Sequence, residues 1–291
     1  MRHPLFGLGL ATLGALVLTP DALFMRLSGM AGYQMVGWRG AMMGAVMLAL
    51  WAATSRGRAR DLAALWSGAG LVLIVSQYAN MTLFSLGIAH APAAVMLMGV
   101  AAVPVFAALL SWLVMGERTR PATWAAIVAV LTGLAIAVAG DGGARMTGSA
   151  LIGAAAGLAV ALVLALNFVV LRARPGMSIP LVIGVGATLA GATGWAVTGP
   201  AAMTGGAVWA IAVCGLVILP MSFFSLSLAS RHTHASNVSL LLLLETVLGP
   251  LWVWLGVGEA PTPMMLAGGA MVVVSLAVYL WHTGRRRMAV A

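Results

Sequence analysis

The sequence predicts an all-α polytopic membrane protein with ten transmembrane helices, arranged as two inverted five-helix repeats. Three observations support this fold class. Hydrophobic residues make up 62% of the chain and charged residues only 7%, which leaves too little polar surface for a soluble globule. One short residue pattern occurs twice, in two apolar segments at a constant separation. The arginines gather in alternate loops, as expected for a bundle with a fixed orientation in the bilayer.

Ten apolar segments are long enough to cross a bilayer, for which a helix needs about 20 residues. They cover residues 5–27, 33–53, 66–88, 91–115, 122–139, 149–171, 179–198, 207–228, 235–255 and 264–281. The first could pass for a signal peptide, but it continues past Pro20 without a small-residue cleavage site, so we expect a retained helix. The segments divide the chain into a first repeat (1–140), a second repeat (149–284) and a basic tail (285–291).

The basic residues predict the orientation of the bundle. All fifteen are arginine, and placing both termini in the cytoplasm puts twelve of them on that side. Only Arg26 and Arg145 lie near outer ends of spans, and Arg39 lies within one. The arginines are spread over several loops, which favours lipid headgroups over nucleic acid as their partner. We therefore expect a multi-pass protein of the inner membrane, and we consider a monomer.

The repeated pattern consists of nine identities at one offset of 142 residues. The first copy is His90, Ala93, Val105, Leu109, Trp112, Leu113, Gly116, Glu117 and Pro121, and the second is His232, Ala235, Val247, Leu251, Trp254, Leu255, Gly258, Glu259 and Pro263. The first and sixth spans match at an offset of 146, the second and seventh at 144, and the third and eighth at 142. Five helices in each copy would place the second copy upside down. Inverted repeats predict alternating access to a site near the midplane.

These motifs resemble a known family. Pro104-Val105-Phe106, a Leu-rich stretch, Gly116-Glu117-Arg118-Thr119 and a helix with Gly133 are similar to the EamA-type half of the drug/metabolite transporter superfamily. The second copy, from Glu245 through Gly258-Glu259 to Gly268-Gly269, completes the pair, although Thr246 stands where members often carry proline. The resemblance covers nearly the whole chain. It implies a secondary transporter, and general likeness within the superfamily implies an exporter of amino acids, aromatic ones first.

Two other functions stay open at this point. One is a broad exporter of cationic or amphipathic toxic compounds, for which a membrane carboxylate would be the counter-charge. The other is a channel or lipid scramblase.

Two charged residues in the first two spans are candidates for gating or coupling. A charge at mid-bilayer costs about 2.5 to 3.5 kcal/mol on the insertion scale. Asp21 and Arg39 each lie about six residues from the outer end of a span, or roughly 9 Å deep, so they could pair. The pair would be either structural or part of a gate or proton pathway. Their equivalents in the second copy are Asn167, which we include among the candidates, and Ile183.

Glu245 is the third charged candidate. It falls near the centre of the ninth span, and its equivalent in the first copy is Val103. The position suits a proton relay. The alternative is that a protonated Glu245 hydrogen-bonds a backbone carbonyl freed by Pro250, one of four prolines expected to interrupt spans.

The third and eighth spans carry the predicted substrate-binding residues. At the offset of 142, Asn80 matches Ser222 and Met81 matches Phe223. These helices should face each other across the pseudo-two-fold axis, where aromatic, methionine, amide and hydroxyl groups suit a small amphipathic molecule. The alternative is hydrogen bonding between helices. The full predicted set is Gln77, Tyr78, Asn80, Met81, Phe84, Ser222, Phe223 and Phe224.

Nothing in the sequence points to an enzyme, a cofactor or a metal. The chain has no Gly-x-Ser-x-Gly and no His-Glu-x-x-His motif. Its single cysteine, Cys214, cannot form an internal disulfide. His232 and His234 make at best half a metal site and are more simply read as residues of a solvated loop.

Overall fold

Helices form all the regular structure in the part of the chain that can be described. The computed structural model describes residues 6–91, 93–117 and 148–258, together with separate positions between 121 and 132 and between 263 and 278. Seven helices there are long and apolar enough to cross a membrane: Phe6–Ser28, Gly32–Thr54, Gly68–His90, Ile152–Ala173, Ile179–Thr198, Val208–Ser230 and Ala235–Val257. The protein is therefore a multi-pass membrane protein. The predicted fifth and tenth spans, 122–139 and 264–281, lie largely outside the described residues.

Near a proline, two predicted spans are broken into separate helices and a third contains a π-helical turn. The first consists of α1 (Phe6–Leu18) and α2 (Asp21–Ser28), with Pro20 before α2. The fourth consists of α6 (Ala93–Val100) and α7 (Val103–Met115), with Pro104 in the first turn of α7. The eighth consists of α11 (Val208–Val213), the π-helical turn η2 (Cys214–Ile218) and α12 (Leu219–Ser230), which has Pro220 in its first turn. Proline has no N–H to donate to the preceding turn, so it does not fit well inside a helix. It is tolerated at the start of a helix, because the first N–H groups there have no acceptor within the helix.

Pro250 behaves differently. It lies inside α13 (Ala235–Val257), which continues on both sides of it, so the interruption that we expected in the ninth span is wrong. The missing N–H removes one hydrogen bond within this helix without ending it. Glu245, five residues earlier, therefore projects from an unbroken helix.

The remaining elements are α3 (Gly32–Thr54), α4 (Arg58–Leu65), α5 (Gly68–His90), α9 (Gly148–Ala173), α10 (Ile179–Thr198) and the short 3-10 helix η1 (Ala202–Thr204).

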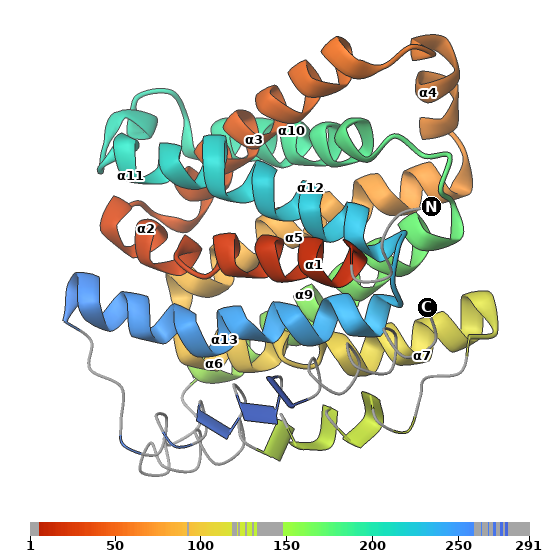
Figure 1. Ribbon diagram of the computed structural model, residues 1–291. Coiled ribbons are helices and arrows are strands. Elements are labelled where there is room, and N and C mark those ends of the chain that lie inside the picture. Colours follow the sequence, from red (N-terminus) through yellow and green to blue (C-terminus); the bar gives the residue numbers. More distant parts are fainter. Residues whose placement is uncertain are drawn as a thin grey trace.

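The two halves of the chain pack on each other in matching ways. In Figure 1, α1 lies between α12 and α13, which are parts of the eighth and ninth predicted spans. The sixth predicted span, α9, packs in turn on α5 and α6 of the third and fourth. The first long helix of each half thus packs against two helices of the other half.

Helices α3 and α10 approach each other more closely than side chains of ordinary size would allow. A Cβ atom on Gly40 would lie 2.4 Å from the backbone nitrogen of Gly191, and one on Gly44 would lie 2.3 Å from Thr188 Oγ1. Numbering rises along α3 as it falls along α10, so the two helices run antiparallel. Gly44 and Thr188 are also 144 residues apart, which is the repeat offset of these two spans.

The repeated Gly-Glu motif is a helix end in both copies. Gly116 follows α7 with φ 66°, and Gly258 follows α13 with φ 78°. Both values are left-handed, a conformation in which a Cβ atom is strained. The glycine of the motif therefore has a structural reason to recur.

The outside of the bundle is apolar. Leucine and valine side chains are widely exposed along it, including Leu16, Val75, Leu113 and Val217. Exposed apolar surface on this scale would aggregate in water but is expected where helices face lipid. Several charged and polar side chains point the other way, into the interior.

Candidate substrate-binding cavity

A cavity lies inside the bundle, between the two halves of the chain. Eight helices contribute to its wall: α1, α2, α3, α5 and α6 from the first half, and α9, α12 and α13 from the second. The lining residues are Leu18, Asp21, Arg39, Asn80, Met81, Phe84, Val100, Leu164, Phe168, Leu219, Phe223, Leu226, Leu242 and Glu245. The wall is mostly aliphatic and aromatic, with four polar or charged side chains. This is the composition of a site for a small molecule with an apolar body.

Much of the wall consists of residues at equivalent positions of the two repeats. At the offsets found in the sequence, four pairs of lining residues correspond: Leu18 with Leu164, Met81 with Phe223, Phe84 with Leu226, and Val100 with Leu242. The charged residues break this correspondence. The equivalents of Asp21, Arg39 and Glu245 are uncharged and do not line the cavity.

Asp21 and Arg39 form a buried ion pair beside the cavity. Asp21 is at the start of α2, directly after the break at Pro20, and its Oδ2 accepts a hydrogen bond from Arg39 Nη2. Arg39 Nη1 donates to Ser85 Oγ at 2.9 Å, and the guanidinium carbon lies 5.5 Å from the centroid of the Phe84 ring. The two charges, which we expected to lie close enough to pair, therefore neutralise each other.

Glu245 reaches the same cavity from α13. Its side chain is only 2% exposed, and Oε1 has no hydrogen-bond partner among the residues that the structure describes. The bond to a carbonyl freed by Pro250, which we considered as a structural role, is not made by this oxygen. Glu245 is thus a buried acceptor facing a cavity whose other two charges are already paired.

The structure places the predicted site residues in two groups. Seven of the twelve line the cavity: Asp21, Arg39, Asn80, Met81, Phe84, Phe223 and Glu245. The other five are not among the lining residues: Gln77, Tyr78, Asn167, Ser222 and Phe224.

The five other residues belong to helix packing around the cavity, where Phe224 is partly buried against the apolar core. Gln77 is buried and lies against α10. A Cβ atom added to Gly186 of that helix would lie 2.7 Å from the Cβ of Gln77. The Tyr78 hydroxyl donates to Thr193 Oγ1 of the same helix, at 3.3 Å. Ser222 is buried where α12 crosses α1, and Asn167 is buried on α9.

Sequence reasoning missed seven apolar lining residues: Leu18, Val100, Leu164, Phe168, Leu219, Leu226 and Leu242. Applying the repeat offset to Phe84 would have found Leu226. Phe168 follows Asn167, so its neighbourhood was identified, but a phenylalanine in an apolar span carries no signal of its own. The same holds for the leucines and valine.

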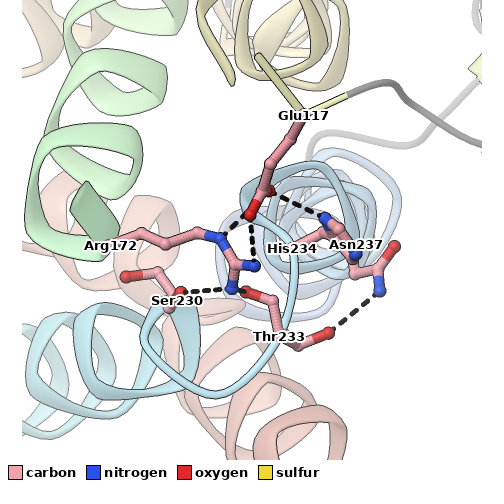
Figure 2. Close-up of polar contacts among 6 residues, drawn as sticks. All are labelled: Glu117, Arg172, Ser230, Thr233, His234 and Asn237. Atoms are coloured by element: carbon pink, nitrogen blue, oxygen red, sulfur yellow. Dashed lines mark hydrogen bonds and ion pairs between the residues drawn. The ribbon is translucent and has the colours of Figure 1, made fainter. Parts of the chain in front are cut away.

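A second polar cluster joins the two halves at one end of the bundle (Figure 2). Glu117, after α7, accepts two hydrogen bonds from Arg172 of α9: Nη2 to Oε1 at 2.8 Å and Nε to Oε2 at 3.2 Å. His234 Nδ1 lies 3.0 Å from Glu117 Oε2, so this histidine is not simply part of a solvated loop. Arg172 also donates to the carbonyls of Ser230 and Thr233. We call these five residues the Glu117 cluster.

The charges of this cluster favour the ionised form of Glu117. Partial burial alone would raise the pKa of its carboxyl group, but the hydrogen bonds and positive charge of Arg172, with a further contribution from His234, outweigh that effect. The pKa of Glu117 is therefore lowered from its ordinary value. A bidentate arginine–carboxylate contact of this kind is among the stronger polar contacts in proteins.

Comparisons with known proteins agree with this architecture. Residues 5–139 match the EamA-like transporter family. A protein of Streptantibioticus cattleyicolor named "Probable terminal-alkyne amino-acid exporter" is 31% identical over 244 residues, which cover 80% of this chain and 78% of that protein. A crystal structure titled "Crystal structure of protein" superimposes with a TM-score of 0.73 at 21% identity, over 94% of this chain and 96% of the other, and so shares the fold. The chain belongs to the EamA-like transporter family of the drug/metabolite transporter superfamily, and is a membrane transporter rather than an enzyme.

Proposed function

We propose that this protein is a secondary transporter that exports small organic solutes, most of all amino acids with aromatic ones preferred, by alternating access. The single observation that carries the proposal is the cavity, whose wall is lined by equivalent residues of both repeats. A site between two related halves can open to either side when the halves rock. We place the protein in the inner membrane with both termini in the cytoplasm.

The packing of the helices supports an inverted arrangement of ten spans. The antiparallel contact of α3 and α10 brings the repeat equivalents Gly44 and Thr188 together, as expected where a two-fold axis in the membrane plane crosses a helix pair. Equivalent helices also contact equivalent neighbours: α1 packs on α12 and α13, and α9 packs on α5 and α6. We propose that the predicted fifth and tenth spans complete the two copies.

The chemistry of the cavity supports an amino acid as cargo. Phe84, Phe168, Phe223 and Met81 offer surfaces for an apolar or aromatic side chain, while Asn80 and the charged residues can orient polar ends. The relative from Streptantibioticus cattleyicolor is named as a probable exporter of a terminal-alkyne amino acid, and an alkyne is an apolar group. Both observations favour a solute with a charged head and an apolar body.

The Glu117 cluster is our candidate for the contact that closes one end of the transporter. It ties Glu117 of the first half to Arg172 and His234 of the second. In a rocking mechanism, contacts between the halves at this end have to separate once in each cycle. By the positive-inside distribution, we assign this end to the cytoplasm.

Transport assays in proteoliposomes test the proposal. Uptake of labelled phenylalanine should saturate and be competed by excess unlabelled amino acid. Conductance or lipid movement without saturation would instead indicate the channel or scramblase. Competition by bulky cationic dyes but not by amino acids would indicate the broad exporter of toxic compounds.

We also propose that Glu245 couples transport to protons, with Asp21, Arg39 and Asn167 contributing to gating or coupling. Glu245→Gln keeps the size of the side chain and removes its ability to ionise. Transport by this variant should no longer respond to a pH gradient. An unchanged response would leave Glu245 without a coupling role.

A further inference from the structure

We infer that Glu245 is the counter-ion for the positively charged group of the substrate, and that the cavity selects solutes in which an ammonium group adjoins an apolar or aromatic body. The inference rests on the proposed function of the cavity as the transport site. It goes further because it assigns the substrate's charged head to one side chain and predicts which charge a solute must carry.

The first step is the charge of the cavity wall. Asp21 and Arg39 bind each other, so their charges cancel. Among the described lining residues, Glu245 is then the one ionisable side chain without an opposite charge in contact. When it is ionised, its uncompensated carboxylate attracts cations and repels anions.

The second step is the state of the Glu245 carboxyl group. It is 2% exposed, and its Oε1 has no hydrogen-bond partner among the described residues. A buried polar atom without a partner is rare and costly, more so for a carboxylate. Asp21 Oδ1 on the same wall also has no hydrogen-bond partner among the described residues, but the charge of Asp21 is paired with Arg39. The vacant acceptor of Glu245 is therefore the one that points to a ligand with a hydrogen-bond donor, and an ammonium group supplies both donors and charge.

The third step is the surroundings of the carboxyl group. Leu242 precedes Glu245 by about one helical turn and lines the same wall, with Leu219, Phe223 and Phe168 from neighbouring helices. These side chains offer apolar contact close to one charged acceptor. The arrangement suits an amino acid or an aromatic amine, and it disfavours an aromatic acid that has no amino group.

The experiment measures ligand-induced stabilisation of the purified full-length protein in detergent. Three probes share a phenyl ring: phenylalanine, phenethylamine, which lacks the carboxylate, and 3-phenylpropionate, which lacks the ammonium group. Phenylalanine and phenethylamine should raise the Tm of the wild-type protein in a saturable way. 3-Phenylpropionate should bind at least about tenfold more weakly, since it leaves the carboxylate of Glu245 unpaired.

Two variants connect the result to the side chain. Glu245→Gln should weaken binding of both amines by about tenfold or more, and Glu245→Asp should recover part of the loss. Asp61→Asn is the matched control, because Asp61 bonds Trp51 and Ser55 outside the cavity, and it should bind like the wild type.

The outcomes separate this inference from the proposed function. Equal binding of 3-phenylpropionate and phenethylamine by the wild type would overturn the role of Glu245 even if both variants failed to fold. Wild-type affinity for amines in Glu245→Gln would overturn it too, while an amino acid could remain the cargo. Failure of all three probes to bind would overturn the aromatic cargo and the inference together.

Discussion

Replacing Arg39 by methionine should destabilise the protein by about 3 to 5 kcal/mol, the usual cost of removing one partner of a buried ion pair. Arg39 and Asp21 are 2% and 1% exposed, so water cannot compensate the carboxylate that remains. The loss also leaves Asp21 and Glu245 as two unpaired carboxylates on one cavity wall. The free energy of unfolding can be measured by titrating detergent-solubilised protein with sodium dodecyl sulfate.

A second variant separates the charge effect from lost packing. Asp21→Leu together with Arg39→Met removes both charges and should recover most of the loss, because an apolar replacement of a buried pair is often neutral. Arg58→Met is the control, since Arg58 is exposed and should change stability by no more than about 0.5 kcal/mol. The reasoning fails if Arg39→Met is as stable as this control, or if the double variant is no more stable than Arg39→Met.

Three further predictions concern packing, the Glu117 cluster and a residue outside the cavity. Gly40→Ala places a Cβ 2.4 Å from a backbone atom of α10 and should lower the Tm. Gly9→Ala, which has open space around the added Cβ, should leave the Tm unchanged. Equal Tm values for the two variants would contradict the close packing. The lowered pKa of Glu117 means that its contact with Arg172 contributes stability above the ordinary glutamate pKa and loses it as pH falls through the lowered value. The stability difference between wild type and Glu117→Gln should therefore not diminish from about pH 8 to 5 and should shrink below. A difference that already fades near neutrality would refute this. Tyr78→Phe should cost only about 0.6 kcal/mol and leave phenylalanine binding unchanged in the Tm assay, while weakened binding would return Tyr78 to the site.

The membrane character of the fold and its helices could be read from the sequence because each leaves a periodic or compositional trace. The breaks at Pro20 and Pro104 and the π-helical turn before Pro220 agree with the missing N–H of proline. Pro250 did not interrupt α13, since one lost hydrogen bond does not end a helix that its neighbours hold in place. The position of a proline therefore indicates where a helix can break, and whether it breaks depends on how the helix packs against its neighbours.

The site was only partly predictable for a related reason. Charged residues in apolar spans are conspicuous, so Asp21, Arg39 and Glu245 were found from the sequence alone. Tyr78 sits at the same depth as the cavity residues, yet its side chain contacts α10, and depth along a helix cannot reveal which face it turns inward. The contact of Glu117 with Arg172 links positions 55 residues apart and needed the tertiary structure.

Labelling of repeat-equivalent positions from each side of the membrane tests the inverted architecture most directly. Pro121 and Pro263 are 142 residues apart and exposed, and each can be replaced by cysteine in a Cys214→Ala background. A membrane-impermeant maleimide added outside sealed, uniformly oriented vesicles should modify one of these cysteines, and the other should react only when the reagent is inside. Reaction of both cysteines from the same side would contradict the inverted repeat, and with it alternating access about the cavity.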